Sequence, residues 1–138
     1  MSQMEIEKSG NKYWRDLNGY FHREDGPAIE YVDGAKLWFI GGNLHRTDGP
    51  AVEYVDGSKY WYINGNYHRE DGPAVEYADG TKLWYINGES HRKDGPAIEY
   101  ADGSKEWYIN GDEYSFEEWL DQLQISDEEK IMLCLKWK

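Results

Sequence analysis

Residues 68–88 have the sequence HREDGPAVEYADGTKLWYING. Two segments within it, AVEYA and TKLWYI, are rich in the aromatic and β-branched residues that favour strands. Only Asp79-Gly80 separates them, a pair that favours a two-residue hairpin turn because both turn positions need positive φ. Asn87-Gly88 marks a second turn, and Pro73 stands at the start of a strand, where its missing N–H costs least. The stretch therefore predicts a β-hairpin.

This stretch occurs four times, at a spacing of 23 residues. The copies begin at His22, His45, His68 and His91. Each contains a Trp (Trp38, Trp61, Trp84, Trp107) and ends in a Gly (Gly42, Gly65, Gly88, Gly111). Repetition at a fixed period is typical of proteins built from stacked structural units. Residues 19–111 are therefore predicted to form four hairpins in one elongated antiparallel sheet.

The expected two-residue loop fixes the register of each hairpin and sorts its side chains onto two faces. It pairs Ala78 with Thr81, Tyr77 with Lys82 and Val75 with Trp84. The more apolar face, which we expect in the core, then contains Val75, Tyr77, Lys82, Trp84 and Ile86. The other face contains Ala74, Glu76, Ala78, Leu83 and Tyr85. The four Trp are expected to stack in the core, with a platform for nucleic-acid bases as the alternative.

The two ends of the chain depart from the repeat. Ser115 with Glu118, and Ser126 with Glu129, have the spacing of a capping box, so residues 112–138 are predicted to form two short helices that close the sheet. One helical face there is apolar: Phe116, Trp119, Leu120 and Leu123. Residues 1–18 contain YWRDLNG, a partial repeat that is expected to supply an N-terminal cap.

Composition restricts the possible partners. The formal net charge is -12, which opposes direct binding to nucleic acid or anionic membrane and favours a basic partner. Cys134 is the single cysteine, so no internal disulfide can form. The opening residues MSQMEIEKSG lack the apolar segment of a secretory signal. These features predict a cytoplasmic protein.

The pattern EYxDGxKxWYxNG, present at residues 53–65 and 76–88, resembles MORN-type repeats. It is most similar to the MORN-like variant of YwqK-type antitoxin-like proteins and phage proteins. The resemblance covers residues 11–111. It implies a sheet of tandem hairpins, a bacterial host cell and a non-enzymatic inhibitor, either an antitoxin or a phage protein that blocks a host defence complex or nuclease. This chain differs from that pattern because every repeat also contains HRxDGPA.

The His-Arg-x-Asp element resembles a catalytic or metal-binding group, but its repetition argues against both. Copies two strands apart lie roughly 10 Å from one another and cannot converge on one metal ion. No nucleophile recurs with them, so we expect no enzyme, metal or cofactor. The element is expected to join neighbouring repeats, with Asp71 capping the Gly72-Pro73 turn and Arg69 pairing with an acid. The alternative is an anion-binding ladder for a nucleotide: His22, Arg23, His45, Arg46, His68, Arg69, His91 and Arg92.

An acidic aromatic strip is the expected partner-binding surface, because Tyr offers a large rigid contact with a polar tip. It comprises Glu30, Phe39, Glu53, Tyr60, Tyr62, Glu76, Tyr85, Glu99 and Tyr108. The expected partner is the basic surface of a nucleic-acid-binding protein or a toxin. The alternatives are a nucleotide-sequestering protein and a structural scaffold. An unpaired sheet edge or the helices could also support a homodimer.

Overall fold

Across residues 2–138, which the computed structural model describes, the chain forms seventeen short strands and two helices. Eleven strands form one antiparallel sheet, so the prediction of a mainly β fold of tandem hairpins is confirmed. In sheet order they are β1 (Gln3–Ile6), β2 (Lys12–Arg15), β3 (Ile29–Glu30), β4 (Lys36–Leu37), β7 (Val52–Glu53), β8 (Lys59–Tyr60), β11 (Val75–Glu76), β12 (Lys82–Leu83), β15 (Ile98–Glu99), β16 (Lys105–Ile109) and β17 (Asp112–Tyr114). The helices are α1 (Phe116–Gln122) and α2 (Asp127–Trp137).

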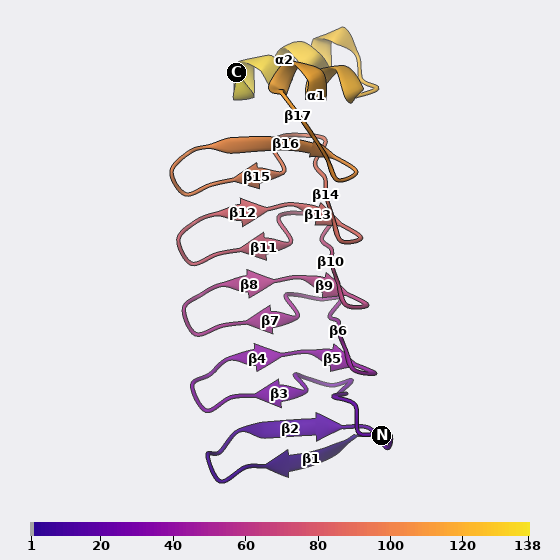
Figure 1. The fold of residues 1–138 in the computed structure, drawn as a ribbon, viewed down its shortest axis with the longest axis vertical. Coiled ribbons are helices and arrows are strands. Elements are labelled where there is room, and N and C mark those ends of the chain that lie inside the picture. Colours follow the sequence, from indigo (N-terminus) through magenta and orange to yellow (C-terminus); the bar gives the residue numbers. More distant parts are fainter. Residues whose placement is uncertain (1) are drawn as a thin grey trace.

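A second, smaller hairpin follows the first one in the repeats. The pairs are β5 (Phe39–Ile40) with β6 (Asn43–Leu44), β9 (Tyr62–Ile63) with β10 (Asn66–Tyr67), and β13 (Tyr85–Ile86) with β14 (Glu89–Ser90). The turn predicted at Asn87-Gly88 closes one of them, with φ of 50° and 82°. Two positive φ values in a two-residue loop define a type I′ turn. Figure 1 shows these hairpins stacked along one side of the long sheet.

The turn at Asp79-Gly80 differs from the prediction, because its loop has three residues and not two. Tyr77 donates its N–H to the Thr81 carbonyl at 2.9 Å, and Gly80 donates to the Tyr77 carbonyl at 3.0 Å. Gly80 alone has positive φ, 97°. This is a type I turn followed by a bulge glycine. The register is therefore Glu76 with Lys82 and Val75 with Leu83.

This shift of one residue moves the side chains of the return strand to the opposite face. Leu83, and not Trp84, lies on the same face as Val75, while Lys82 lies opposite Glu76. Across the long sheet, one face therefore has a row of alternating charges: Lys12, Glu30, Lys36, Glu53, Lys59, Glu76, Lys82, Glu99 and Lys105. We call it the polar face. Directly opposed residues of opposite charge stabilise antiparallel pairs.

Apart from Trp107 beside the C-terminal cap, the buried hydrophobic residues of the repeats are small or β-branched, and the predicted core face was partly wrong. Both Ala74 and Val75 are buried, so both sides of β11 are covered. Equivalent pairs occur in the other repeats: Ala28 and Ile29, Ala51 and Val52, Ala97 and Ile98. In contrast, Tyr77 and Lys82 are exposed and Trp84 is only half-buried. The repeats are too thin to enclose large aromatic side chains.

The large apolar core lies at the C-terminal end, where the helices cover the last strands (Figure 1). Ser115 caps α1 in the predicted capping box with Glu118, and Ser126 accepts the Glu129 N–H at the start of α2. The core contains Trp107, Trp119 and Leu123, with partly buried Ile109, Tyr114, Phe116, Leu120, Ile125, Leu133 and Trp137 around them. The predicted apolar face of the first helix is thus confirmed.

At the other end, β2 pairs with β3 and extends the repeat pattern, as expected for a partial repeat. The terminal strand is β1, which pairs with β2 alone. Its residues Gln3–Ile6 are all exposed. Neither helix formed within residues 2–138 is long and apolar enough to cross a bilayer.

Candidate functional site

The His-Arg-x-Asp element organises the polar face of each repeat around one guanidinium group. Arg69 donates from Nε to Asp71 at 3.0 Å, and from Nη1 to both the Pro73 carbonyl and Glu76 at 3.0 Å. Its Cζ lies 3.9 Å from the centre of the Trp61 ring, in cation–π contact. The predicted pairing of Arg69 with an acid is present. Asp71 receives the Arg69 side chain, which differs from the expected role of capping a turn through backbone bonds.

The same cluster recurs in the other three repeats. The Nε–Asp distances are 2.9 Å for Arg23, 2.9 Å for Arg46 and 2.7 Å for Arg92. Their Cζ atoms lie 3.8 to 3.9 Å from the rings of Trp14, Trp38 and Trp84. Three of the four Trp that were expected to stack together, Trp38, Trp61 and Trp84, therefore pack against arginines instead. The fourth, Trp107, contacts Trp119 of the C-terminal cap, with 4.6 Å between ring centres. The arginines also bind Glu30, Glu53 and Glu99.

The Asp-Gly-Pro sequence is required by the closeness of the guanidinium group. A Cβ atom on Gly72 would lie 2.8 Å from Cζ of Arg69, a distance at which one of the two must move. The equivalent glycines, Gly26 and Gly49, would meet their own arginines at 2.9 and 3.0 Å. The backbone of this loop therefore forms one wall of the arginine site.

Each histidine binds the second turn of its own repeat, 19 residues further along the chain. The backbone N–H of Asn87 donates to Nδ1 of His68 at 3.0 Å, and Asn64 and Asn110 donate equally to His45 and His91 at 3.0 Å. In the first repeat Gly41 donates to His22 at 2.9 Å. Nδ1 is the acceptor in all four bonds, so this nitrogen carries no proton in any of them.

These contacts within the protein account for the recurrence of the His-Arg-x-Asp element at the same place in every repeat. Both of the charged groups expected to bind an anion are engaged: the arginines hold two carboxylates each, and the histidines accept backbone bonds. Within residues 2–138 no three His, Cys, Asp or Glu side chains are grouped in a way that could hold a metal ion. The geometry therefore favours a structural role for the element, in joining neighbouring repeats, over the binding of an anion.

Three hollows open on the polar face, one between each pair of successive arginine loops. Their volumes are about 770, 750 and 700 Å³. The middle hollow is lined by one arginine loop, with Arg46 and Gly49, and by Trp61 and Ile63 from the end of the same repeat. The next arginine loop, residues 68–71, forms its far wall. The other two have the equivalent residues. We call them the open hollows.

The opposite face has a cluster of six tyrosines, which we call the tyrosine face: Tyr54, Tyr60, Tyr62, Tyr67, Tyr77 and Tyr85. Ring centres lie 4.5 Å apart for Tyr62 and Tyr67, and 5.1 Å apart for Tyr67 and Tyr85. Tyr60 contacts Tyr54, Tyr67 and Tyr77 at 5.6 to 6.3 Å. Tyr54 and Tyr77 are 47% and 41% exposed. The cluster is thus packed together yet open to solvent.

Three phenols of the tyrosine face are partly removed from solvent. Partial desolvation is the main cause that raises the pKa values of Tyr60, Tyr62 and Tyr77 above 10.0. In the fourth repeat, desolvation together with the nearby carboxylates of Glu106 and Glu113 raises the pKa of Tyr108 to about 12. The hydroxyl groups are therefore hydrogen-bond donors throughout the physiological pH range.

The predicted acidic aromatic strip is not one surface. Tyr60 shares its face with Val52 and Val75, whereas Glu53 and Glu76 lie on the polar face. Glu30, Glu53, Glu76 and Glu99 all bind arginines and stand opposite lysines, so their charges are balanced. Phe39 and Tyr108 lie outside the tyrosine face, and the Phe39 ring packs 5.4 Å from that of Phe21. The error follows from the turn register.

Sequence reasoning missed two features of these surfaces. Tyr67, at the centre of the tyrosine face, occupies a position that is Leu44 and Ser90 in neighbouring repeats, so the repeat pattern hid it. The arginine–tryptophan contacts were missed because a smaller hairpin separates the two residues in the chain, as β9 and β10 separate Trp61 from Arg69. The recurrence of one Arg and one Trp in each repeat was the available signal.

Neither a scan against protein-family models nor a search of curated proteins finds a match to this chain.

Proposed function

We propose that this chain is a non-enzymatic protein-binding repeat protein that engages a basic protein partner through its tyrosine face. The observation that supports the proposal is the exposed cluster around Tyr60 and Tyr67. Tyrosine supplies large contact area with little loss of conformational entropy, and it is enriched at protein interfaces. Because these rings already pack against one another, little further ordering would be required on binding.

The charge distribution favours a basic partner. The glutamates of the polar face are balanced by arginine and lysine, so the net charge of -12 comes from other residues. Residues 111–138 contain eight acids and three lysines. A further acid stands in each exposed turn: Asp33, Asp56, Asp79 and Asp102. Such excess negative charge accelerates encounter with a basic surface and makes the association rate sensitive to salt.

The resemblance to MORN-like antitoxin-like and phage proteins suggests a more specific form of this proposal. In that form the protein is an inhibitor in the cytoplasm of a bacterial cell, and its target is a toxin, a nuclease or another nucleic-acid-binding protein. The acidic excess suits a surface that ordinarily contacts phosphates.

Affinity capture from bacterial lysate, followed by binding measurements with each purified partner, tests the proposal. The informative variant is Tyr60→Ser combined with Tyr67→Ser, and the matched control is Lys59→Ser, which alters the opposite face of the same strand. We expect the tyrosine variant to weaken binding at least about tenfold, since buried interface tyrosines are frequent hot spots. The control should bind within about twofold.

Circular dichroism and thermal unfolding must show that both variants remain folded. Binding that survives the tyrosine substitutions, or that is insensitive to salt, would contradict the proposed surface or the basic character of the partner, respectively.

A further inference from the structure

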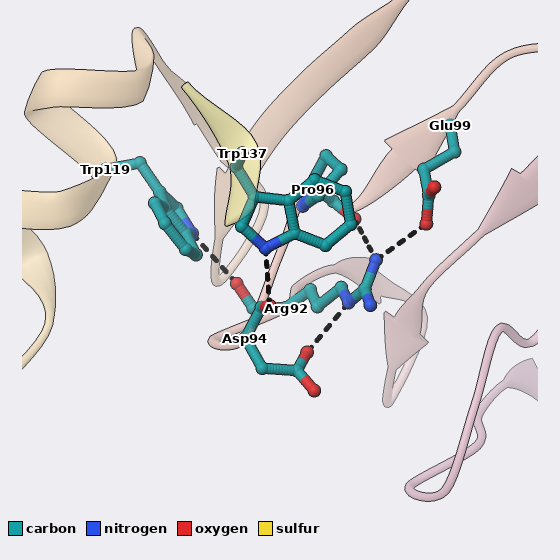
Figure 2. A network of polar contacts seen from close by, with 6 residues as sticks. All are labelled: Arg92, Asp94, Pro96, Glu99, Trp119 and Trp137. Atoms are coloured by element: carbon teal, nitrogen blue, oxygen red, sulfur yellow. Dashed lines mark hydrogen bonds and ion pairs between the residues drawn. The ribbon is translucent and has the colours of Figure 1, made fainter. Parts of the chain in front are cut away.

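The C-terminal cap fills the place at which a fourth hollow would open. Trp137 of α2 lies against the loop of the fourth repeat and donates from Nε1 to the Asp94 carbonyl at 3.0 Å. Its ring is 6.1 Å from that of Trp107, the counterpart of Trp61. Figure 2 shows this indole beside the Arg92 guanidinium group and Pro96. Trp119 adds a second indole N–H, which donates to the Arg92 carbonyl at 2.9 Å.

The filled site shows what an indole contributes there. Gly95 and Pro96 are buried, whereas Gly72 and Pro73 of the preceding repeat are only half-buried. Arg92 contacts two indoles, Trp84 at 3.8 Å and Trp137 at 5.4 Å. Its side chain is 11% exposed, against 21% for Arg23, 23% for Arg46 and 21% for Arg69. The second indole thus covers the side of the arginine loop that the other repeats leave open.

The open hollows offer the same groups. Each has an arginine loop on one side, as at Gly49, and a Trp–Ile pair on the other, as at Trp61 and Ile63. The next arginine loop, residues 68–71 in this case, lies beside that pair. The carbonyl oxygens of Asp25, Asp48 and Asp71, which correspond to the acceptor for Trp137, receive no hydrogen bond from residues 2–138. Their carboxylates are 84 to 87% exposed at the rim.

We propose that the open hollows bind tryptophan side chains of a partner protein, one indole in each, in the manner in which Trp137 fills the fourth. Each indole would stack beside the repeat's arginine and donate its N–H to the Asp carbonyl. The exposed aspartates at the rim select a partner whose tryptophans are flanked by lysine or arginine. This surface lies on the polar face and is independent of the tyrosine face.

The spacing of the repeats further defines the partner. Neighbouring hollows are separated by two strands, roughly 10 Å. Three residues of extended chain span about the same distance. In the extended polyproline II conformation, which has three residues per turn, tryptophans at positions i and i+3 also point to the same side, so such a segment fills two hollows at once and its second contact is intramolecular.

Titration of the isotope-labelled full chain with N-acetyltryptophanamide, followed by NMR, tests the site. We expect the amide signals of Gly26, Gly49 and Gly72 to shift with millimolar affinity, and that of Gly95 to remain, because Trp137 occupies its site. The 1-methyl analogue, which lacks the indole N–H, should bind about fivefold more weakly. Absence of shifts, or equal shifts at Gly95, would overturn the proposal.

Ile63→Trp supplies an internal control, because the larger side chain fills only the middle hollow. It should abolish the shift at Gly49 and leave those at Gly26 and Gly72, which also reports that the variant is folded. The peptide Trp-Ser-Lys-Trp should bind at least about tenfold more tightly than Ala-Ser-Lys-Trp. Equal affinities of the two peptides would exclude docking of a protein segment across neighbouring hollows.

Discussion

The backbone N–H of Asn87 donates to Nδ1 of His68, so the second turn of a repeat is held by the side chain that begins the same repeat, 19 residues away. A backbone bond lies next to it, because the N–H of Gly88 donates to the Tyr67 carbonyl at 2.8 Å. The other three repeats have equivalents of the histidine bond. Protonation of Nδ1 would remove the acceptor and place a cation against an N–H group.

Acidification should destabilise the protein through His91. Burial, with a smaller effect of Lys93, lowers the pKa of His91 below 6.5. Because the fold favours the neutral ring, the stabilisation is complete above the unfolded-state pKa and is lost as the pH falls through the lower folded-state pKa. Urea unfolding between about pH 7.5 and 5.5 should show this loss, on the order of 1 kcal/mol for the bond.

The matched variant for this measurement is His91→Asn, whose amide oxygen can accept the Asn110 N–H but does not titrate. It should lose less stability than the original protein over the same pH range. An identical pH dependence for the two chains would show that His91 is not the titrating group.

Arg69→Lys should lower the free energy of unfolding by about 2 to 3 kcal/mol although the charge is kept. A lysine ammonium group is a point charge and cannot stack on Trp61 while bridging Asp71 and Glu76. Denaturant unfolding measures the loss. Lys59→Gln, at an exposed position of the same sheet, should change stability by at most about 0.5 kcal/mol; a similar change in both variants would refute a special role for the guanidinium geometry.

Asn87 should tolerate glycine but not alanine. Its φ of 50° lies in the left-handed region, where a Cβ atom is unfavourable and where Gly41 stands in the first repeat. We expect Asn87→Ala to cost about 1 kcal/mol and Asn87→Gly to be nearly neutral. Thermal unfolding of the two variants side by side checks the type I′ turn. Equal destabilisation would indicate that the Asn side chain, and not the backbone conformation, is what matters.

Trp119→Ala should destabilise the packing of the C-terminal helices against the fourth repeat. This side chain is 0% exposed and donates to the Arg92 carbonyl, so its removal leaves both a cavity and an unpaired acceptor. We expect a loss of about 3 to 5 kcal/mol. Hydrogen exchange should show faster exchange first in the fourth repeat and last in the first one, because repeat units contact mainly their neighbours. Leu135→Ala, at a position 76% exposed, should have little effect. Uniform acceleration across all repeats would contradict local opening.

The period, the hairpins and both helix caps could be predicted, because each depends on residues close in sequence, such as Ser115 and Glu118. The faces could not. Asp79-Gly80 suits either a two-residue loop or a three-residue loop with a bulge glycine, and the choice reverses every side chain after it. The contact of Trp61 with Arg69 could not be predicted either, because it depends on where the chain bends between strands.

The pairing of Lys82 with Glu99 has a consequence for how such a chain can change in length. The strand pairs at each junction join equivalent positions of adjacent repeats, so a duplicated copy of residues 66–88 placed after Gly88 would pair in the register that the sheet already has. Each duplication would add two strands to the long sheet, roughly 10 Å to its span and one more hollow. The length of the sheet can thus increase in steps of one repeat, while the helical cap continues to close its C-terminal end.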